Sequence, residues 1–456
     1  MAPLSEFLDE PSYVLSIPHL LAVERYILSL ALRFALIGRI DAARDFTEIL
    51  YSRSPLQDQG FSGLRALVPY WRKTHFPTGV PDKIKTDAYF NDCISEKQQQ
   101  GLQWCHYTPV DQRTEDEAGI TAALSPVSIP YPQYRIPAQT VALDIAIKLA
   151  ENRNVESSRD TKVLEVLAAI AERFPKAWEL SSLIDSPIRV PVFMSGALAR
   201  IWDFSDHELD SRAAQLLEAS RQRFWYGPTT RGPETISGLL ESCNDDTVTR
   251  TALDDEVDNI TSLYKPPATE QEIIDLEERL GVTLPDDFKV FLRISNGSEG
   301  IWNGYFPGPP LRSTAEIDWL DYSEYELMFD QLNLMQLENE LDSDEFSEFP
   351  IFTEVICIAS EDIYDVWLIP PGTMEHMRDH YRKLYNAVDD HGKRVIERAI
   401  DDFAGSWDEW ENLKWGCCSW ACGGSAQLDS YKSFKAWLEN EAWDAKNVGR
   451  ESLESA

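Results

Sequence analysis

Three closely spaced cysteines form the densest group of potential metal ligands in the chain. They are Cys417, Cys418 and Cys422, within the segment WGCCSWACGG. A structural zinc site usually takes four ligands and includes a CxxC-type pair, and this segment provides neither. Because the segment is also rich in tryptophan, we expect buried thiols here instead of a metal site.

Two histidines offer a second arrangement that suits metal chemistry. His376 and His380 lie four residues apart in a stretch with helical periodicity, a spacing that can place two imidazoles on one ion. Such a site needs at least a third ligand, and Asp379 lies on another face of the helix. His207 lacks the second histidine of a zincin motif. We therefore predict that the chain holds no metal and no cofactor.

Catalytic motifs are missing from the rest of the sequence as well. The chain contains no nucleophile–base motif and no glycine-rich phosphate loop, so we predict that it is not an enzyme. A hydrolase whose carboxylates meet only in the fold is an alternative. A pocket with two converging carboxylates of separated pKa would favour the hydrolase, whereas a flat acidic groove would favour binding.

Charge is the strongest bulk feature of the sequence. The net charge is −35, and residues 241–456 hold 47 acidic but only 17 basic side chains. No lysine or arginine occurs between Arg312 and Arg378. Such a surface repels phosphate groups, so we expect no binding to nucleic acid. Basic protein surfaces are the expected partners; the alternative is that the acidity only keeps the protein soluble.

The acidic excess peaks in residues 321–349, which hold ten acidic side chains and no basic one. The DSDE run at 342–345 lacks the spaced oxygen ligands and central glycine of a calcium-binding EF-hand loop. We therefore expect a solvated acidic insertion.

An aromatic turn, IWNGYFPGPPLRS, precedes this acidic segment. Aromatic side chains beside glycine and proline can form a recognition lip, or they can plug the bottom of a sheet. We expect function to reside in this turn and at the start of the acidic segment. The candidate interaction residues are Asn296, Gly297, Trp302, Tyr305, Phe306, Asp321 and Glu324.

Two short amphipathic helices at 269–297 lead into the aromatic turn. Thr269 and Glu272 form a capping-box pattern, and Gly281 provides a left-handed exit from the first helix. Helices this short cannot bury their apolar stripes alone, so they need a sheet or further helices to pack on. We infer that this stretch opens a domain.

The run GVTLPDDFKVFLRISNG resembles the opening of the SUKH superfamily, which includes the yeast cell-wall assembly regulator and many bacterial toxin-immunity proteins. Leu284, Pro285 and Phe288 are the fold-signature residues of this resemblance, which covers residues 265–440. It implies an α+β domain with a mostly antiparallel sheet and flanking helices. It also implies a binding role, because the family has no single shared catalytic activity. The acidic segment and a helical excursion at 373–412 depart from the family pattern.

The resemblance implies a non-enzymatic protein-interaction or regulatory protein. By likeness to the fungal branch, it would act in cell-wall assembly and stress-signalling control, with signalling proteins among its partners. An immunity-like protein that binds a basic toxin is the alternative, because an acidic face complements a basic toxin electrostatically. The large helical addition at the N-terminus argues against a minimal antidote.

The expected organisation is α+β, with a mostly α-helical N-terminal domain followed by the SUKH-like domain. The helical domain spans residues 1–230 and includes an irregular proline-rich segment at 75–137. An acidic linker is expected at 231–264, and the SUKH-like domain at 265–445. The resemblance does not extend to the helical half.

Periodicity places several elements within these domains. We expect an αα-hairpin at 17–52, and two strands at 350–359 and 363–369. Asp429 is expected to cap a final helix that contains Tyr431.

Location is inferred from composition. No apolar run approaches the roughly 18–20 residues of a membrane span, and the stretch MAPLSEFLDEP lacks the features of a secretory signal. Seven irregularly spaced cysteines suggest reduced thiols. We expect a cytoplasmic protein, with the nucleus as a further location. The sequence gives no indication of the oligomeric state.

Overall fold

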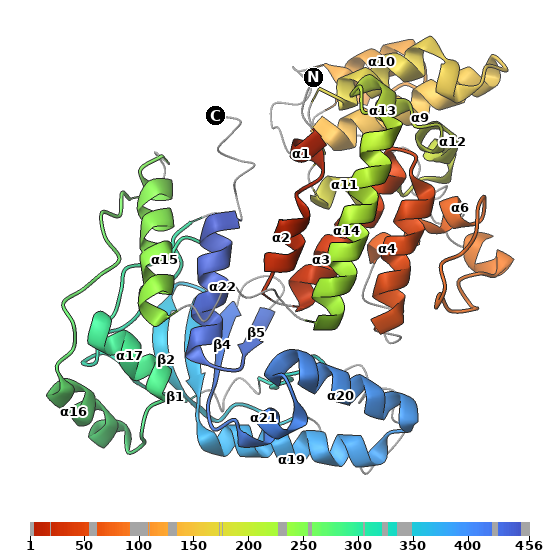
Figure 1. The fold of residues 1–456 in the computed structure, drawn as a ribbon. Helices are drawn as coiled ribbons and strands as arrows, with labels where there is room; N and C mark the ends of the chain where they lie inside the picture. The colour runs from red at the N-terminus through yellow and green to blue at the C-terminus, as the bar shows by residue number, and fades with distance from the viewer. Residues whose placement is uncertain are drawn as a thin grey trace. The chain divides into compact units, whose positions relative to one another are not determined.

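The chain divides into two compact units, residues 1–229 and 230–456. A computed structural model describes residues 4–18, 20–53, 62–91, 108, 110–125, 135–172, 174–175, 177–226, 235–253, 258–303, 306–321, 327–334, 349–421 and 427–447. Figure 1 shows helices in the first unit, and a sheet with helices in the second. The predicted α+β class is confirmed. No helix in the described ranges is long and apolar enough to cross a membrane.

The described part of the first unit is built from helices. Their bounds are α1 Leu4–Phe7, α2 Pro11–Ser16, α3 Leu20–Leu36, α4 Ile40–Arg53, α5 Ser62–Arg65, α6 Val68–Trp71, η1 Val110–Gln112, α8 Glu117–Leu124, α9 Arg135–Asn152, η4 Ser157–Arg159, α10 Thr161–Ile170, α11 Ala177–Ile184, η5 Pro187–Arg189, α12 Val190–Met194, α13 Ala197–Ile201 and α14 Asp206–Tyr226. The predicted αα-hairpin is confirmed as α3 and α4, which pack against each other. Phe34 and Phe46 stack between them, with ring centroids 5.4 Å apart.

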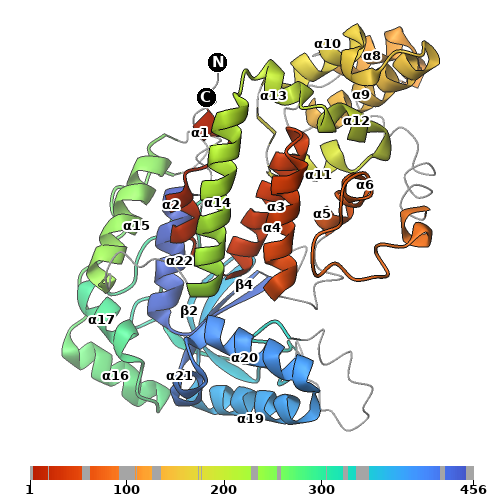
Figure 2. The same ribbon diagram turned by 45° about the vertical axis from the view of Figure 1, so that its right-hand side comes forward.

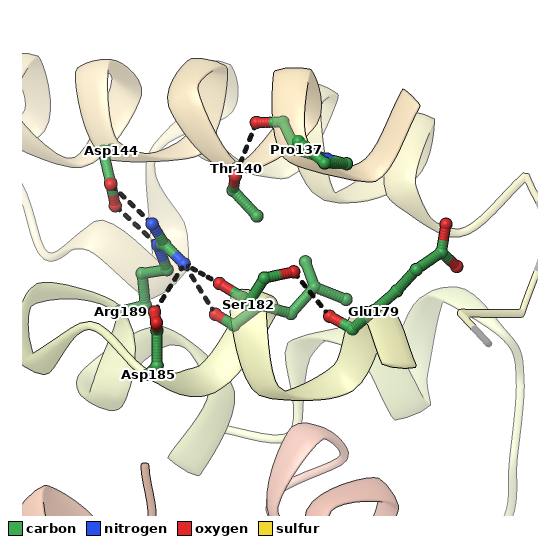
Figure 3. A network of polar contacts seen from close by, with 8 residues as sticks. Pro137, Thr140, Asp144, Glu179, Ser182, Asp185 and Arg189 are labelled. Carbon is green, nitrogen blue, oxygen red and sulfur yellow. Dashed lines mark hydrogen bonds and ion pairs between the residues drawn. The ribbon is translucent and has the colours of Figure 1, made fainter. Parts of the chain in front are cut away.

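One buried arginine connects three of these helical segments (Figure 3). Arg189, at the end of η5, is only 7% exposed. Its guanidinium donates to both carboxylate oxygens of Asp144 on α9, at 2.6 Å each. It also donates to the backbone carbonyls of Ser182 and Leu183 on α11. A bidentate pair of this kind fixes geometry as well as charge.

The second unit contains an antiparallel five-stranded sheet in the order β1-β2-β3-β4-β5. Its strands are β1 Asp318–Asp321, β2 Glu354–Glu361, β3 Tyr364–Ile369, β4 Gly416–Ala421 and β5 Gln427–Tyr431. Its helices are α15 Ile236–Thr251, α16 Glu270–Leu280, α17 Asp286–Ile294, α19 Pro371–Ala387, α20 Asp390–Ala404, α21 Trp407–Asn412 and α22 Phe434–Asn447. The two predicted strands correspond to β2 and β3, and the predicted antiparallel sheet is confirmed.

Both faces of this sheet carry buried side chains. On β3, Val366 and Leu368 join a core with residues of α15, α16, α17 and α22. Trp367 points to the other face, because successive strand residues alternate, and its ring lies 5.4 Å from that of Phe352. Helices α19, α20 and α21 follow β3 in the chain, and α19 and α20 lie side by side in Figure 1 and Figure 2.

The stretch 231–264, expected to be a linker, contains the packed helix α15. Leu239, Leu240 and Cys243 of α15 are buried in the core of the second unit. The helix packs on α22 and α17. The segment is acidic overall, but its apolar residues recur at helical spacing and so lie on one face of the helix. That face is buried, whatever the net charge of the segment.

The predicted start of the last helix was wrong. Asp429 lies in β5, where it pairs in register with Ser419 of β4, and Tyr431 ends that strand. Helix α22 begins at Phe434, and the hydroxyl of Ser433 accepts a hydrogen bond from the backbone N–H of Ala436 at 3.1 Å. Ser433 is therefore the residue that caps the helix.

Replacing Arg189 with methionine is expected to lower the free energy of unfolding by about 3 kcal/mol, because Asp144 and two carbonyls lose a buried partner. Urea unfolding of the full chain, followed by circular dichroism, measures the change. The matched control is Lys148→Met, which breaks a pair with Glu115 whose side chains are 42% and 60% exposed. That control is expected to lower stability by less than about 0.5 kcal/mol. Equal losses in the two variants would contradict the structural role of Arg189.

Candidate functional site

The two helices before the aromatic turn are fixed by their own caps. Thr269 accepts from the backbone N–H of Glu272 at 3.2 Å, and the Glu272 carboxylate accepts from the backbone N–H of Thr269 at 2.7 Å. The predicted capping box is thus confirmed. Gly281 ends α16 with a φ of 67°, which is the left-handed exit that was predicted.

The fold-signature residues serve packing. Leu284 and Phe288 are buried, and Pro285 directly precedes α17. The Phe288 ring meets the ring of Phe434 on α22 edge-on, with centroids 4.9 Å apart. These contacts place α17 against the last helix, and they leave Leu284 and Phe288 without an exposed surface for a partner.

Asn296 and Gly297 hold the start of the aromatic turn in place. The side-chain oxygen of Asn296 accepts from the backbone N–H of Thr314 at 2.7 Å. Gly297 is buried and has a φ of 88°, and a Cβ there would lie 2.6 Å from the carbonyl oxygen of Leu311. Both residues therefore have clear structural roles in positioning the turn.

The aromatic residues of the turn have different positions. Trp302 is buried, and its backbone N–H donates to the hydroxyl of Thr247 on α15 at 3.0 Å. Phe306 is 39% exposed, and its ring centroid lies 5.7 Å from that of Tyr364. Tyr305 lies outside the described residues. Trp302 therefore packs in the core, whereas the ring of Phe306 stays partly exposed.

Phe306 lies beside an acidic hairpin turn. Tyr364 opens β3, and Glu361 and Asp362 precede it and are both exposed. Asp362 has a φ of 53°, a left-handed conformation that aspartate tolerates better than most residues. We call Phe306, Tyr364, Glu361 and Asp362 the turn surface. It combines two aromatic rings with two exposed carboxylates.

Asp321 is not part of the turn surface. In the β1–β2 register it lies opposite Glu354, at the other end of β2. β2 has eight residues, so at about 3.3 Å per step its first and last Cα atoms lie roughly 23 Å apart. Asp321 and Glu354 carry like charges on neighbouring strands, which is unfavourable. Both side chains are exposed, so solvent screens their repulsion. Glu324 lies outside the described residues.

The two histidines on α19 do not face a common site. His376 is exposed, whereas His380 is buried against the ring of Phe349 at 4.3 Å. Burial, with a smaller effect of Lys383, lowers the pKa of His380 to about 4. Within the ranges that the structure describes, no group of three or more His, Cys, Asp or Glu side chains is arranged to hold a metal ion.

The thiols are placed as the tryptophan-rich sequence suggested. Cys417 and Cys418 are buried on β4, and Cys422 lies outside the described residues. Burial raises the pKa of both buried thiols well above the ordinary value, with smaller effects of neighbouring acidic groups. Because the thiolate is the reactive form, these two cysteines are inert at neutral pH.

Two carboxylates on α22 were missed by sequence reasoning. Burial raises the pKa of Glu441 to about 8, with further increases from the charges of Asp444 and Asp429. Burial also raises the pKa of Asp444 to about 7, against a hydrogen bond from Asn440 that lowers it. Glu441 follows the buried Leu438 by three residues, so helical spacing could have placed it near the core. An acid–base pair needs pKa values pushed apart, and these two move in the same direction.

The family comparison concerns the second unit. Residues 267–406 match the model of the SMI1 / KNR4 family (SUKH-1), which confirms the resemblance over α16 to α20. The match does not reach the helical first unit. No solved structure matches the chain significantly.

One curated relative is similar to part of this chain. The Bacillus subtilis (strain 168) protein described as "Uncharacterized protein YnaB" is 31% identical over 94 residues, which is 21% of this chain and 46% of the relative. The chain thus spans about half the length of this relative.

Replacing Gly297 with alanine is expected to lower the free energy of unfolding by about 3 kcal/mol, because the new Cβ meets the Leu311 carbonyl in a left-handed backbone. The control is Gly281→Ala, since Gly281 also has a positive φ but no atom within 4 Å of its Cβ position. That change is expected to lower stability by about 1 kcal/mol. Equal urea midpoints for the two variants would contradict the close approach at Gly297.

His380 makes stability depend on pH. Its pKa is about 4 in the folded chain and about 6.5 in an unfolded one. The unfolded state therefore binds more protons between these values, and stability falls as the pH drops from about 6.5 to about 4.

The chain with His380→Gln lacks this proton uptake. Its stability relative to the unmodified protein should therefore improve by about 2 kcal/mol between pH 7.5 and pH 4.5. Urea unfolding at both pH values measures the difference. The exposed His376→Gln variant is the control, and its relative stability should not change. A constant difference for His380→Gln would contradict the buried neutral imidazole.

Proposed function

We propose that the chain is a non-enzymatic interaction and regulatory protein whose C-terminal unit binds a basic surface of a protein partner. The observation that carries this proposal is the turn surface, where Phe306 and Tyr364 meet beside two exposed carboxylates. The unit that contains it also contains the match to the SUKH-1 family.

The turn surface has the composition of a binding site. Aromatic side chains dominate the energetics of many interfaces, because they bury a large area with little loss of conformational freedom. Glu361 and Asp362 would attract a basic partner and reject an acidic one. The absence of lysine and arginine between Arg312 and Arg378 strengthens this selectivity.

The rigidity of the site also supports a binding role. Asn296 and Gly297 fix the start of the turn, and the β2–β3 hairpin fixes its other half. A preformed surface loses less conformational entropy when a partner binds. The structural roles of these residues therefore support the proposal indirectly.

The biological setting is the finer part of this proposal. The resemblance to the yeast regulator favours cell-wall assembly and stress-signalling control, in the cytoplasm or nucleus. The resemblance also offers a second candidate, an immunity-like role in which the unit neutralises a basic toxin, and the matched relative is bacterial. Both candidates require the same kind of contact, a basic protein surface on an acidic one.

Affinity purification of the full chain followed by binding measurements with the purified partner tests the proposal. Phe306→Ala is expected to lower the affinity for the partner about tenfold, because it removes an exposed aromatic anchor. The double change Glu361→Gln and Asp362→Asn should lower the affinity about fivefold at low salt and by a smaller factor at high salt.

The control is Asp275→Asn with Glu278→Gln, which removes two exposed charges from α16. It should change the affinity less than twofold. Partner binding that is equal in all variants would contradict the turn surface as the binding site. Turnover of a glycan or peptide substrate by the purified chain would contradict the non-enzymatic role.

A further inference from the structure

A hollow of about 590 Å³ lies among the three helices that follow β3. Among the residues that the structure describes, it is lined by Tyr385 of α19, Glu397 and Asp401 of α20, and Trp407 of α21. Two aromatic rings and two carboxylates thus face one open space.

The aromatic walls are held by hydrogen bonds. The ring centroids of Tyr385 and Trp407 are 5.1 Å apart, and the rings meet edge-on at 62°. The indole N–H of Trp407 donates to Glu411 at 3.2 Å, and the hydroxyl of Tyr385 donates to one carboxylate oxygen of Glu397 at 2.5 Å. Both rings are therefore oriented before any ligand arrives.

The carboxylates provide negative charge at the rim. Glu397 and Asp401 are exposed and lie four residues apart on α20, so they share one face of the helix. Like charges at this spacing repel each other, and a cation between them relieves the repulsion. The carboxylate of Asp401 makes no hydrogen bond or ion pair with the part of the chain that the structure describes.

Two positively charged side chains of the same unit, Lys393 and Arg382, lie near the residues that line the hollow. The ammonium group of Lys393 lies 5.7 Å from the centre of the Tyr385 ring, so that ring already takes part in a cation–π contact. Arg382 pairs with Asp379 and with Glu411, the residue that accepts from Trp407. Within the described residues, Arg382 does not pair with Glu397 or Asp401. A metal ion suits the site less well, because no third ligand joins the two carboxylates among the described residues.

We propose that this hollow binds a positively charged side chain, lysine or arginine, from a basic segment of a protein partner. Aromatic faces attract cations through their quadrupole, and two carboxylates add ion pairing. The inference deepens the proposed function and rests on it, because it adds a second point of contact on the same unit.

Calorimetric titration of the full chain with short peptides tests the hollow directly. One peptide carries three lysines separated by glycines, a second carries arginine at those positions, and a third carries uncharged citrulline. The lysine and arginine peptides are expected to bind and to quench tryptophan fluorescence, whereas the citrulline peptide is not. Asp401→Asn and Trp407→Leu should each weaken binding about tenfold.

Asp408→Asn is the matched control, because Asp408 is exposed on α21 but does not line the hollow. It should change the affinity less than twofold. Asp401→Asn changes an exposed side chain and keeps the test valid if Trp407→Leu unfolds. Equal losses in Asp401→Asn and Asp408→Asn would overturn the proposal, because they would indicate general charge attraction. Choline binding without peptide binding would overturn the assignment to a protein segment.

Failure of the hollow and failure of the proposed function give different results. If Phe306→Ala lowers the affinity for the purified partner but Asp401→Asn and Trp407→Leu do not, the proposed role of the hollow is overturned and the proposed function stands. If the peptides bind the hollow but the partner binds every turn-surface variant with unchanged affinity, the turn surface is overturned as the binding site instead.

Discussion

Burial of the sheet on both faces is the constraint on which the second unit depends. Val366 and Leu368 face the core that contains α16, α17 and α22, and Trp367 faces the opposite side. Antiparallel sheets commonly leave one face to solvent, whereas here side chains on both faces are buried. The face of Val366 and Leu368 is covered by the helices of the SUKH-like opening and by the last helix. On the other face, the sulfur of Met374 on α19 lies against Gly416 of β4, and Trp410 of α21 packs on Tyr381 of α19. The turn surface lies at an end of this sheet, and the hollow lies among the helices that follow β3.

The same constraint explains why so few residues of the recognisable motif are free to bind. Phe288 is buried against Phe434, and Gly297 sits where no side chain fits. These residues build the frame, and exposed groups are held beside them. Phe306 is one such group, because the residues before it fix its turn and Tyr364 supports its ring. Under the proposed function, this separation would let the fold stay the same while the exposed residues change to suit a partner.

Sequence reasoning predicted the elements whose signals are local. The caps at Thr269 and Gly281, the αα-hairpin and the strands β2 and β3 all follow from patterns within a few residues. It failed where a distant segment decides the outcome. Asp429 looks like a helix cap, but pairing with β4 draws it into a strand. The grouping of Tyr385, Glu397, Asp401 and Trp407 depends on how three helices pack, and their sequence spacing carries no such information.

Hydrogen–deuterium exchange of the full chain with and without its purified partner tests the central claim most directly. The account predicts slower exchange on binding in the β2–β3 turn around Glu361 and Asp362 and beside Phe306. The exposed face of α16 should exchange at the same rate in both samples. Protection confined to the first unit, or to α16, with no change at the β2–β3 turn, would contradict the account.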